Sequence, residues 1–138
     1  MPERTLAICK PDSVSAGRAG AILARLEEEG FRIRGLKRLR LAADQAREFY
    51  AVHRERPFFD GLVTFMTEGP VIAAALERDD AVAHLRKTMG ATDSRKADPG
   101  TIRKLHGTDI ERNAIHGSDS AENAAREIAF FFSAAELL

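Results

Sequence analysis

Hydrophobic and polar positions in the first part of the chain predict a strand, a helix and a second strand. Residues 4–9 are mostly apolar, as is typical of a short buried strand. Residues 21–29 place their large apolar side chains on one helical face and end at a glycine. Apolar and basic residues then alternate over 31–41, and Gly35 interrupts the alternation. This pattern predicts a half-exposed strand with a bulge at the glycine.

The rest of the chain adds helices, a central strand and a long loop. The expected helices span about 44–52, 59–66, 79–89 and 121–131, and Ser120 is the expected N-cap of the last one. The apolar run 71–76 predicts a central strand, and residues 110–115 fit either a short strand or an extended segment. Residues 90–100 are small, polar and charged, which predicts a loop of the length that is usually functional.

This order of elements predicts the fold class. It fits an α/β (α+β) protein with a ferredoxin-like split βαβ arrangement, in which helices pack on one face of a four-stranded antiparallel sheet. The chain has 138 residues and contains no repeat or linker, so we expect residues 1–138 to form a single domain.

Charge and composition limit the function classes. Lys plus Arg and Asp plus Glu number 21 each, so a nucleic acid is not expected as the main ligand, and any phosphate must be held by locally clustered cations. The single cysteine, Cys9, cannot form an intramolecular disulfide, which favours a reducing compartment. The N-terminus does not resemble a signal peptide, and no apolar run is long enough to span a membrane. We therefore expect a cytoplasmic protein.

The segment 113–120 carries the side chains that are hardest to explain as packing. It reads Asn-Ala-Ile-His-Gly-Ser-Asp-Ser and places His116 beside a glycine, two hydroxyls and a carboxylate, just before a helix. A glycine next to the imidazole would let a bulky ligand approach the backbone. Taken alone, the segment fits an ordinary helix N-cap with a surface histidine better.

Cations elsewhere in the chain favour a ligand-binding role for this segment over an ordinary N-cap. Arg86 and Arg103 flank the long loop together with Thr92, and Lys10 follows the first strand. Two guanidinium groups and an ammonium group commonly hold a diphosphate or triphosphate, although an arginine alone is more often a solvated surface charge. The neighbouring Phe58-Phe59 pair offers an aromatic side chain for stacking, and we expect Phe59 to lie in the core instead.

With these residues assembled, the chain resembles the nucleoside diphosphate kinase family over nearly its whole length. The most specific match is the 113–120 segment, which is similar to the family's active-site signature. The supporting motifs are Lys10-Pro11-Asp12, Phe49-Tyr50, Glu55-Arg56-Pro57-Phe58-Phe59, Gly69-Pro70-Val71, Met89-Gly90-Ala91-Thr92 and Pro99-Gly100-Thr101-Ile102-Arg103. The sequence departs from the family after Arg103, where it reads Lys-Leu-His-Gly; this affects the expected placement of Arg103.

The resemblance implies the catalytic roles. His116 would be the nucleophile and would attack the γ-phosphorus of a nucleoside triphosphate through Nδ1. Glu127 would hydrogen-bond the imidazole and keep its tautomer and orientation. Tyr50 and Ser118 would support the site through hydrogen bonds. The implied reaction is a ping-pong transfer of the γ-phosphoryl group from ATP to a nucleoside diphosphate through a phosphohistidine.

The resemblance also implies the phosphate ligands. Arg86, Thr92 and Arg103 would hold the β- and γ-phosphates, with His53 a weaker candidate for the same task. Mg²⁺ would bridge the phosphate oxygens. The sequence contains no carboxylate cluster typical of a protein-held metal, so we expect Mg²⁺ to arrive on the nucleotide.

The remaining implied contacts hold the nucleoside. Lys10 and Asn113 would bond the ribose hydroxyls, and Lys10 could also reach the transferred phosphoryl group. Phe58 would stack on the base, with Leu62 and Ile110 lining the same slot. Because stacking tolerates any base, we expect low base specificity.

The resemblance points to a homo-oligomer, a tetramer or a hexamer built from dimers. Two rival functions remain open on the sequence. A histidine phosphocarrier module would use His116 but needs no base slot or phosphate clamp. A nucleic-acid-binding regulator would use the basic strand at 31–41 and is disfavoured by the zero net charge.

Overall fold

A computed structural model of the chain describes residues 2–138, which fold around a four-stranded antiparallel sheet. The strand order is β2-β3-β1-β4, so the predicted ferredoxin-like sheet is confirmed. The strands are β1 (Pro2–Cys9), β2 (Arg32–Leu39), β3 (Val71–Asp79) and β4 (Ile115–Gly117).

Helices connect these strands. The α-helices are α1 (Pro11–Ser15), α2 (Ala19–Glu28), α3 (Ala43–Phe49), α4 (Phe59–Met66), α5 (Ala81–Met89), α6 (Ile102–His106) and α7 (Ala121–Phe131). Residues 2–138 also contain three short 3₁₀ turns: η1 (Ala51–His53), η2 (Ser94–Lys96) and, after the last helix, η3 (Ala134–Glu136). Within residues 2–138, no helix has the length and apolar character needed to cross a membrane.

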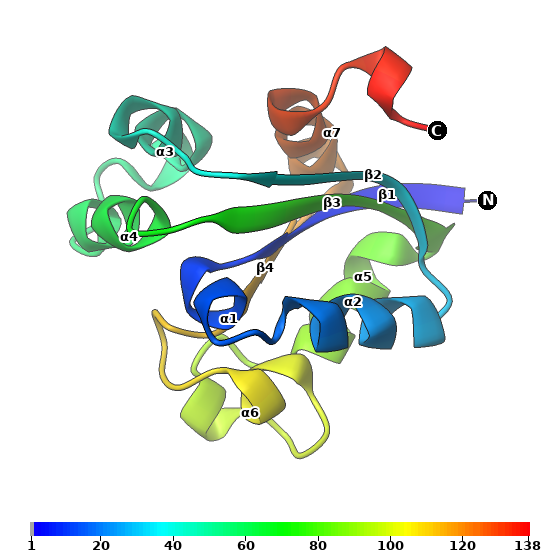
Figure 1. Ribbon diagram of the computed structural model, residues 1–138, viewed down its shortest axis with the longest axis horizontal. Helices are drawn as coiled ribbons and strands as arrows, with labels where there is room; N and C mark the ends of the chain where they lie inside the picture. Colours follow the sequence, from blue (N-terminus) through cyan, green and yellow to red (C-terminus); the bar gives the residue numbers. More distant parts are fainter. Residues whose placement is uncertain (1) are drawn as a thin grey trace.

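The helices cover both faces of the sheet, so the prediction that they pack on one face was wrong. Leu6 and Ile8 of β1 pack in a cluster with residues of α3, α4 and α7. Ala7 and Cys9, which point the other way, pack in a second cluster with residues of α2, α5 and α6. Figure 1 shows these two helix layers on opposite sides of the strands. The cause is visible in β1 and β3, because continuous apolar runs are buried on both faces and need cover on both.

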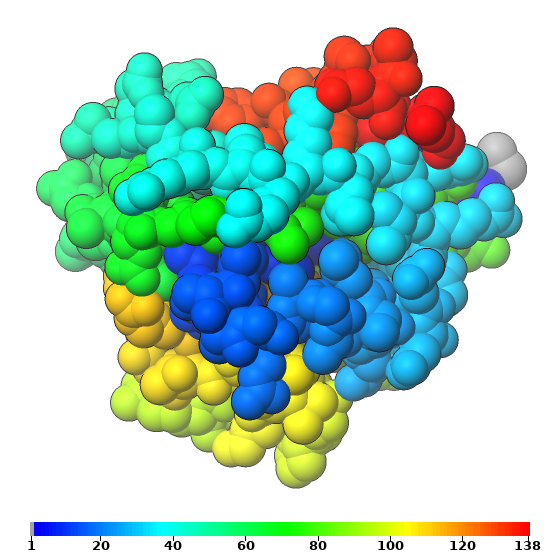
Figure 2. All heavy atoms as spheres, viewed as in Figure 1, coloured from blue at the N-terminus to red at the C-terminus, as the bar shows by residue number. Residues whose placement is uncertain are grey.

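Strand β2 lies at an edge of the sheet and is the most exposed strand. The space-filling view in Figure 2 shows this segment, in cyan, crossing the surface above α2. Its pairing with β3 shifts between Ile33 and Gly35, which confirms the predicted bulge. The glycine has a second role, because a Cβ atom there would lie 2.9 Å from Cε1 of Phe132. Gly35 therefore lets the segment after α7 pack directly against the edge strand.

The last strand is shorter and later than the 110–115 segment that the sequence suggested. Oδ1 of Asp109 accepts hydrogen bonds from the backbone N–H groups of Glu111 and Arg112, at 2.9 and 2.8 Å. Ala114 then adopts a positive φ of 73°. This local turn keeps the preceding residues out of the sheet, and pairing begins only at Ile115. As a result, His116 lies in a strand.

Candidate active site

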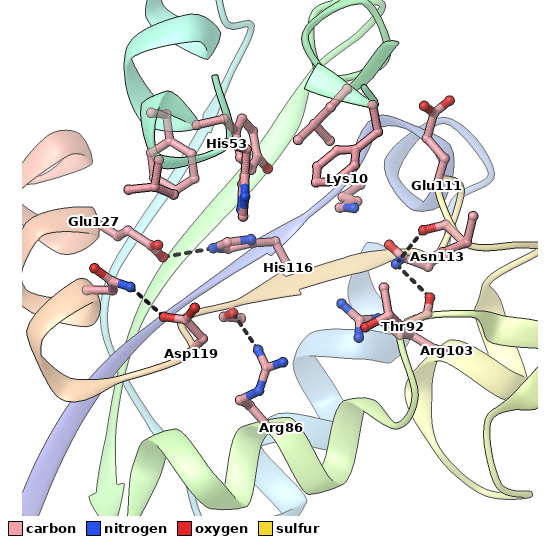
Figure 3. Close-up of a pocket in the computed structure, with 18 of the residues that line it drawn as sticks. Lys10, His53, Arg86, Thr92, Arg103, Glu111, Asn113, His116, Asp119 and Glu127 are labelled. Atoms are coloured by element: carbon pink, nitrogen blue, oxygen red, sulfur yellow. Dashed lines mark hydrogen bonds and ion pairs between the residues drawn. The ribbon is translucent and has the colours of Figure 1, made fainter. Parts of the chain in front are cut away.

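A pocket of about 440 Å³ gathers nearly all the side chains that the sequence singled out. It opens between α3–α4, α5, the loop after α5, β4 and α7 (Figure 3). The predicted residues that line it are Lys10, Tyr50, His53, Phe58, Leu62, Arg86, Thr92, Arg103, Ile110, Asn113, His116 and Glu127. The remaining predicted residue, Ser118, is fully buried beside the pocket and contacts Glu127.

His116 is held by the sheet on one side and by α7 on the other. Its backbone pairs with Ile8 of β1. Its Nε2 atom lies 2.8 Å from Oε1 of Glu127 on α7, and Oγ of Ser118 donates to the same oxygen at 2.8 Å. Within residues 2–138, no hydrogen bond to Nδ1 of His116 is formed, and the ring lines the pocket. The two ring nitrogens therefore have different surroundings.

The charges of this pair follow from burial and contact. Burial opposes ionisation of Glu127, but its interactions with His116, Ser118 and Arg126 together outweigh burial and hold the pKa of the carboxyl below its usual value. Burial lowers the pKa of His116, although Glu127 opposes that shift. The stable form near pH 7 is thus an ionised carboxylate beside a neutral imidazole. Because Glu127 can only accept, the proton lies on Nε2 and the lone pair on Nδ1.

Aromatic rings fix the plane of the imidazole. Tyr50 meets His116 nearly edge-on, with ring centroids 5.9 Å apart and an interplanar angle of 87°. Phe49 contacts the same ring at 5.4 Å. The hydroxyl of Tyr50 is buried and has no hydrogen-bond partner in the described part of the chain, so the hydrogen bond expected of it is not present. In this structure Tyr50 supports His116 by packing.

Three cations converge on the pocket without a carboxylate partner. Nη1 and Nη2 of Arg103 donate to backbone carbonyls of Gly90 and Ile115, at 3.2 and 2.9 Å. Arg86 donates more weakly to a backbone carbonyl of β4, at 3.3 Å. Lys10 is 7% exposed. Across residues 2–138 none of Lys10, Arg86 and Arg103 forms an ion pair. These three cations therefore have no ion-pair partner, although the carboxylates of Glu111, Asp119 and Glu127 also line the pocket.

Burial and the positive charge of neighbouring groups lower the pKa values of two of these cations. Burial, followed by the charge of Arg103, lowers the pKa of Lys10 to about 8. Burial, followed by the charge of Arg86, lowers the pKa of Arg103 to about 10. An anion bound between these groups would relieve the repulsion, because opposite charge favours the protonated forms. The site is thus suited to a polyanion.

Gly117 has a different role from the one expected beside the imidazole. A Cβ atom there would lie 2.5 Å from Sδ of Met89 and 2.9 Å from Cδ2 of Leu85, both on α5. The Cβ side of the glycine is therefore filled by a helix, so the missing side chain makes room for α5, while Gly117 itself lines the pocket. The close packing of α5 on β4 brings Arg86 into contact with the backbone carbonyl of Gly117.

The other end of the pocket is apolar. Phe58 is 50% exposed and Ile110 is 59% exposed, which leaves two large apolar surfaces open to a ligand. Phe59, in contrast, is buried in the core as predicted. Between the apolar and cationic ends, Nδ2 of Asn113 donates to the backbone carbonyls of Thr92 and Ile110, at 2.9 and 3.1 Å.

Sequence reasoning did not assign several polar residues of the pocket. Asp119 accepts a hydrogen bond from Nδ2 of Asn123 at 2.6 Å, a pair four residues apart at the start of α7. Nη2 of Arg126 lies 3.6 Å from Oε2 of Glu127. Helical spacing could have indicated Asn123, which precedes Glu127 by four residues on α7. Glu111 also lines the pocket, and nothing in the sequence signals it, because its position depends on the turn at 109–112.

Comparisons with known proteins agree with this geometry. The family model described as "Nucleoside diphosphate kinase" matches residues 3–137. A relative from Acidiphilium cryptum, named nucleoside diphosphate kinase, is 58% identical over 99% of this chain and 97% of its own. One from Sorangium cellulosum, of the same name, is 56% identical over 98% and 94%.

Solved structures lead to the same family. The nucleoside diphosphate kinase of Aquifex aeolicus superimposes with a TM-score of 0.98 at 52% identity, covering all of both chains. That of Halobacterium salinarum, solved in complex with CDP, gives a TM-score of 0.95 at 47% identity, covering all of this chain and 92% of the other. This chain belongs to the nucleoside diphosphate kinase family.

Proposed function

We propose that the chain transfers the γ-phosphoryl group of ATP, or of another nucleoside triphosphate, to a nucleoside diphosphate through a phosphohistidine at His116. One observation carries the proposal. The imidazole is fixed by Glu127 through Nε2, and its unbonded Nδ1 shares a pocket with three unpaired cations. A neutral nucleophile beside a polyanion site is the arrangement that this reaction requires.

The chemistry proceeds in two matched steps. In the first, the lone pair of Nδ1 attacks the γ-phosphorus, and the bond from phosphorus to the bridging oxygen breaks, so that the nucleoside diphosphate leaves with that electron pair. The ring now carries the phosphoryl group on Nδ1 and a positive charge, which the carboxylate of Glu127 stabilises through its hydrogen bond to Nε2–H. In the second step, a terminal phosphate oxygen of another diphosphate attacks, and Nδ1 recovers its lone pair.

The cations would hold and neutralise the phosphates. Arg86 and Arg103, with the hydroxyl of Thr92, would bind the β- and γ-phosphates, and His53 lines the same pocket as a further candidate. Holding donor and nucleophile in line can lower the barrier by about 7–11 kcal/mol. Because the transition state is loose, with charge on the phosphoryl oxygens, positioning and charge stabilisation account for most of the catalysis.

The nucleoside would occupy the apolar end. The base would stack on Phe58, between Leu62 and Ile110, while Lys10 and Asn113 would reach the ribose hydroxyls. Asn113 lines the pocket, and its buried Oδ1 has no hydrogen-bond partner among residues 2–138.

Mg²⁺ would enter as part of the substrate, bound to the phosphates. Within residues 2–138, no group of three or more His, Cys, Asp or Glu side chains is placed to hold a metal ion. We further propose that residues 1–138 act as one domain in a cytoplasmic homo-oligomer, a tetramer or a hexamer built from dimers. Light scattering of the purified protein would distinguish a monomer from either assembly.

The proposal is tested by incubating the purified protein with γ-labelled ATP alone. The label should become attached to the protein in an acid-labile, base-stable form and should pass to added GDP. His116→Ala should abolish labelling, whereas the control His84→Gln, outside the pocket on α5, should retain it. Label that transfers only to another protein would instead favour a phosphocarrier module. Substantial turnover by His116→Ala would contradict the proposal.

A further inference from the structure

A carboxylate in a pocket built for polyphosphate needs an explanation, and Glu111 is such a group. Its side chain lines the pocket, and Figure 3 shows it at the end away from Arg86 and Asp119. Within the described residues, its carboxylate forms no hydrogen bond or ion pair; only its backbone N–H is held, by Asp109. A negative charge repels phosphate, so this carboxylate is better suited to contact a different part of the ligand.

The carboxylate lies at the edge of the apolar slot. A Cβ atom on Gly61 would lie 3.3 Å from Oε2 of Glu111, so the missing side chain leaves room for this oxygen against α4. Gly61 follows Phe58 by three residues at the start of that helix, which places the two on neighbouring positions of its surface. Glu111 also follows Ile110 directly. The carboxylate is therefore next to both apolar surfaces that would sandwich a base.

We propose that Glu111 is a specificity-determining residue that accepts hydrogen bonds from the edge of the nucleobase and favours guanine. The inference rests on the proposed function, because it requires the base to stack on Phe58. An ionised carboxylate has two acceptor oxygens and no donor. Guanine presents N1–H and the 2-amino group side by side, which matches two acceptors. Adenine and cytosine present one amino group beside an acceptor, and uracil presents its N–H between two carbonyl oxygens that the carboxylate repels.

A role through the neighbouring lysine is the competing explanation. Glu111 raises the pKa of Lys10 against the larger effects of burial and Arg103. If Glu111 acted only through Lys10, its removal would change the affinity of every nucleotide by the same factor, because the ribose and phosphates are common to all of them. If Glu111 selects the base, its removal instead changes the ratios between the dissociation constants of different nucleotides.

The test uses GDP and IDP, whose bases differ only in the 2-amino group, together with UDP. Dissociation constants are measured at equilibrium for the unphosphorylated wild type, Glu111→Gln and Glu111→Ala. The control is Glu28→Gln, which removes an exposed carboxylate outside the pocket. The wild type and the control should bind GDP about three- to tenfold more tightly than IDP, as expected for a solvent-exposed hydrogen bond to a charged group. That preference should disappear in Glu111→Ala. In Glu111→Gln, whose amide adds a donor, the gap between GDP and UDP should narrow.

The inference would be overturned if the ratios of dissociation constants, GDP to IDP and GDP to UDP, were the same in the wild type and in Glu111→Ala. It would also be overturned if the substitution changed the affinity for all three nucleotides by one common factor, or if none of them bound. The same proteins are labelled with γ-labelled ATP to separate this result from the proposed function. If the proteins become labelled but the ratios of dissociation constants do not differ between wild type and variant, base selection alone is contradicted. If the ratios change as expected but no phosphoenzyme forms, the proposed transfer is contradicted and base selection still holds.

Discussion

Nε2 of His116 lies 2.8 Å from Oε1 of Glu127, and this contact decides which ring nitrogen can act as the nucleophile. The ionised carboxylate can only accept a hydrogen bond, so Nε2 carries the hydrogen and Nδ1 keeps the lone pair. Ser118 donates to the same oxygen from a fully buried position, which restrains the carboxylate. The orientation of the nucleophile is thus set by residues that lie behind it.

Replacing Glu127 with glutamine tests this role. The neutral amide keeps the shape but removes the charge that stabilises the phosphorylated ring. We expect kcat to fall about 10- to 100-fold, which corresponds to losing a hydrogen bond to a charged group of about 1.5–3 kcal/mol. Nucleotide binding, measured by titration, should change little because Glu127 faces the histidine. A large loss of affinity with kcat preserved would contradict the assigned role.

The pKa shifts predict a bell-shaped pH dependence of kcat/KM for ATP. His116 must be neutral to attack, and its pKa is lowered, so the acid limb should lie below pH 6.5. Lys10 must be protonated to neutralise phosphate, and its pKa is about 8, so activity should fall as the pH rises through about 8. The measurement is the initial rate of phosphoenzyme formation at low ATP across this range.

Lys10→Arg provides the control for the alkaline limb. A guanidinium stays protonated throughout, so the fall near pH 8 should disappear even if the maximal rate is lower. Persistence of that limb in the variant would assign it to another group.

Phe58→Ala tests the stacking surface. The side chain is 50% exposed at the apolar end of the pocket. Its removal should weaken the binding of every nucleotide by a similar factor, equivalent to about 1–3 kcal/mol. Dissociation constants for ADP, GDP, CDP and UDP give the comparison. A loss confined to purine nucleotides would argue against stacking as the shared contact.

Gly35→Ala tests how the C-terminal segment is attached. The added methyl group would lie 2.9 Å from the ring of Phe132, which is itself buried, so the packing must shift. We expect the free energy of unfolding to fall by about 1–3 kcal/mol in a denaturant titration. Gly20→Ala is the matched control, because a Cβ atom there meets nothing within 4 Å and should stabilise α2 by about 0.4–1 kcal/mol. Equal effects of the two substitutions would exclude the contact with Phe132.

Local sequence patterns predicted the elements that depend on local chemistry. The last helix was placed at Ala121–Phe131 with Ser120 as its cap, and Oγ of Ser120 accepts from the backbone N–H of Asn123 at 3.0 Å. The bulge at Gly35 followed from a break in alternation. The roles of most pocket residues were assigned through family resemblance, since these residues come from separate parts of the chain that only the fold brings together.

Sequence analysis misjudged or missed some residues for one physical reason: their roles depend on neighbours that are distant in the sequence. Gly117 makes room for Met89 and Leu85 of α5, and the sequence cannot show that this helix lies there. The hydroxyl of Tyr50 finds no partner in residues 2–138, although its ring is well placed. Glu111 enters the pocket through a turn that Asp109 sets.

The position of the phosphoryl group on the enzyme tests the central claim most directly. Protein phosphorylated by ATP and kept at alkaline pH can be examined by phosphorus and nitrogen NMR, which distinguish the two isomers of phosphohistidine. The structure predicts one phosphohistidine, at His116, with the phosphorus bonded to Nδ1. Phosphorus on Nε2, or on any other residue, would contradict the account, because Nε2 is the atom that Glu127 holds.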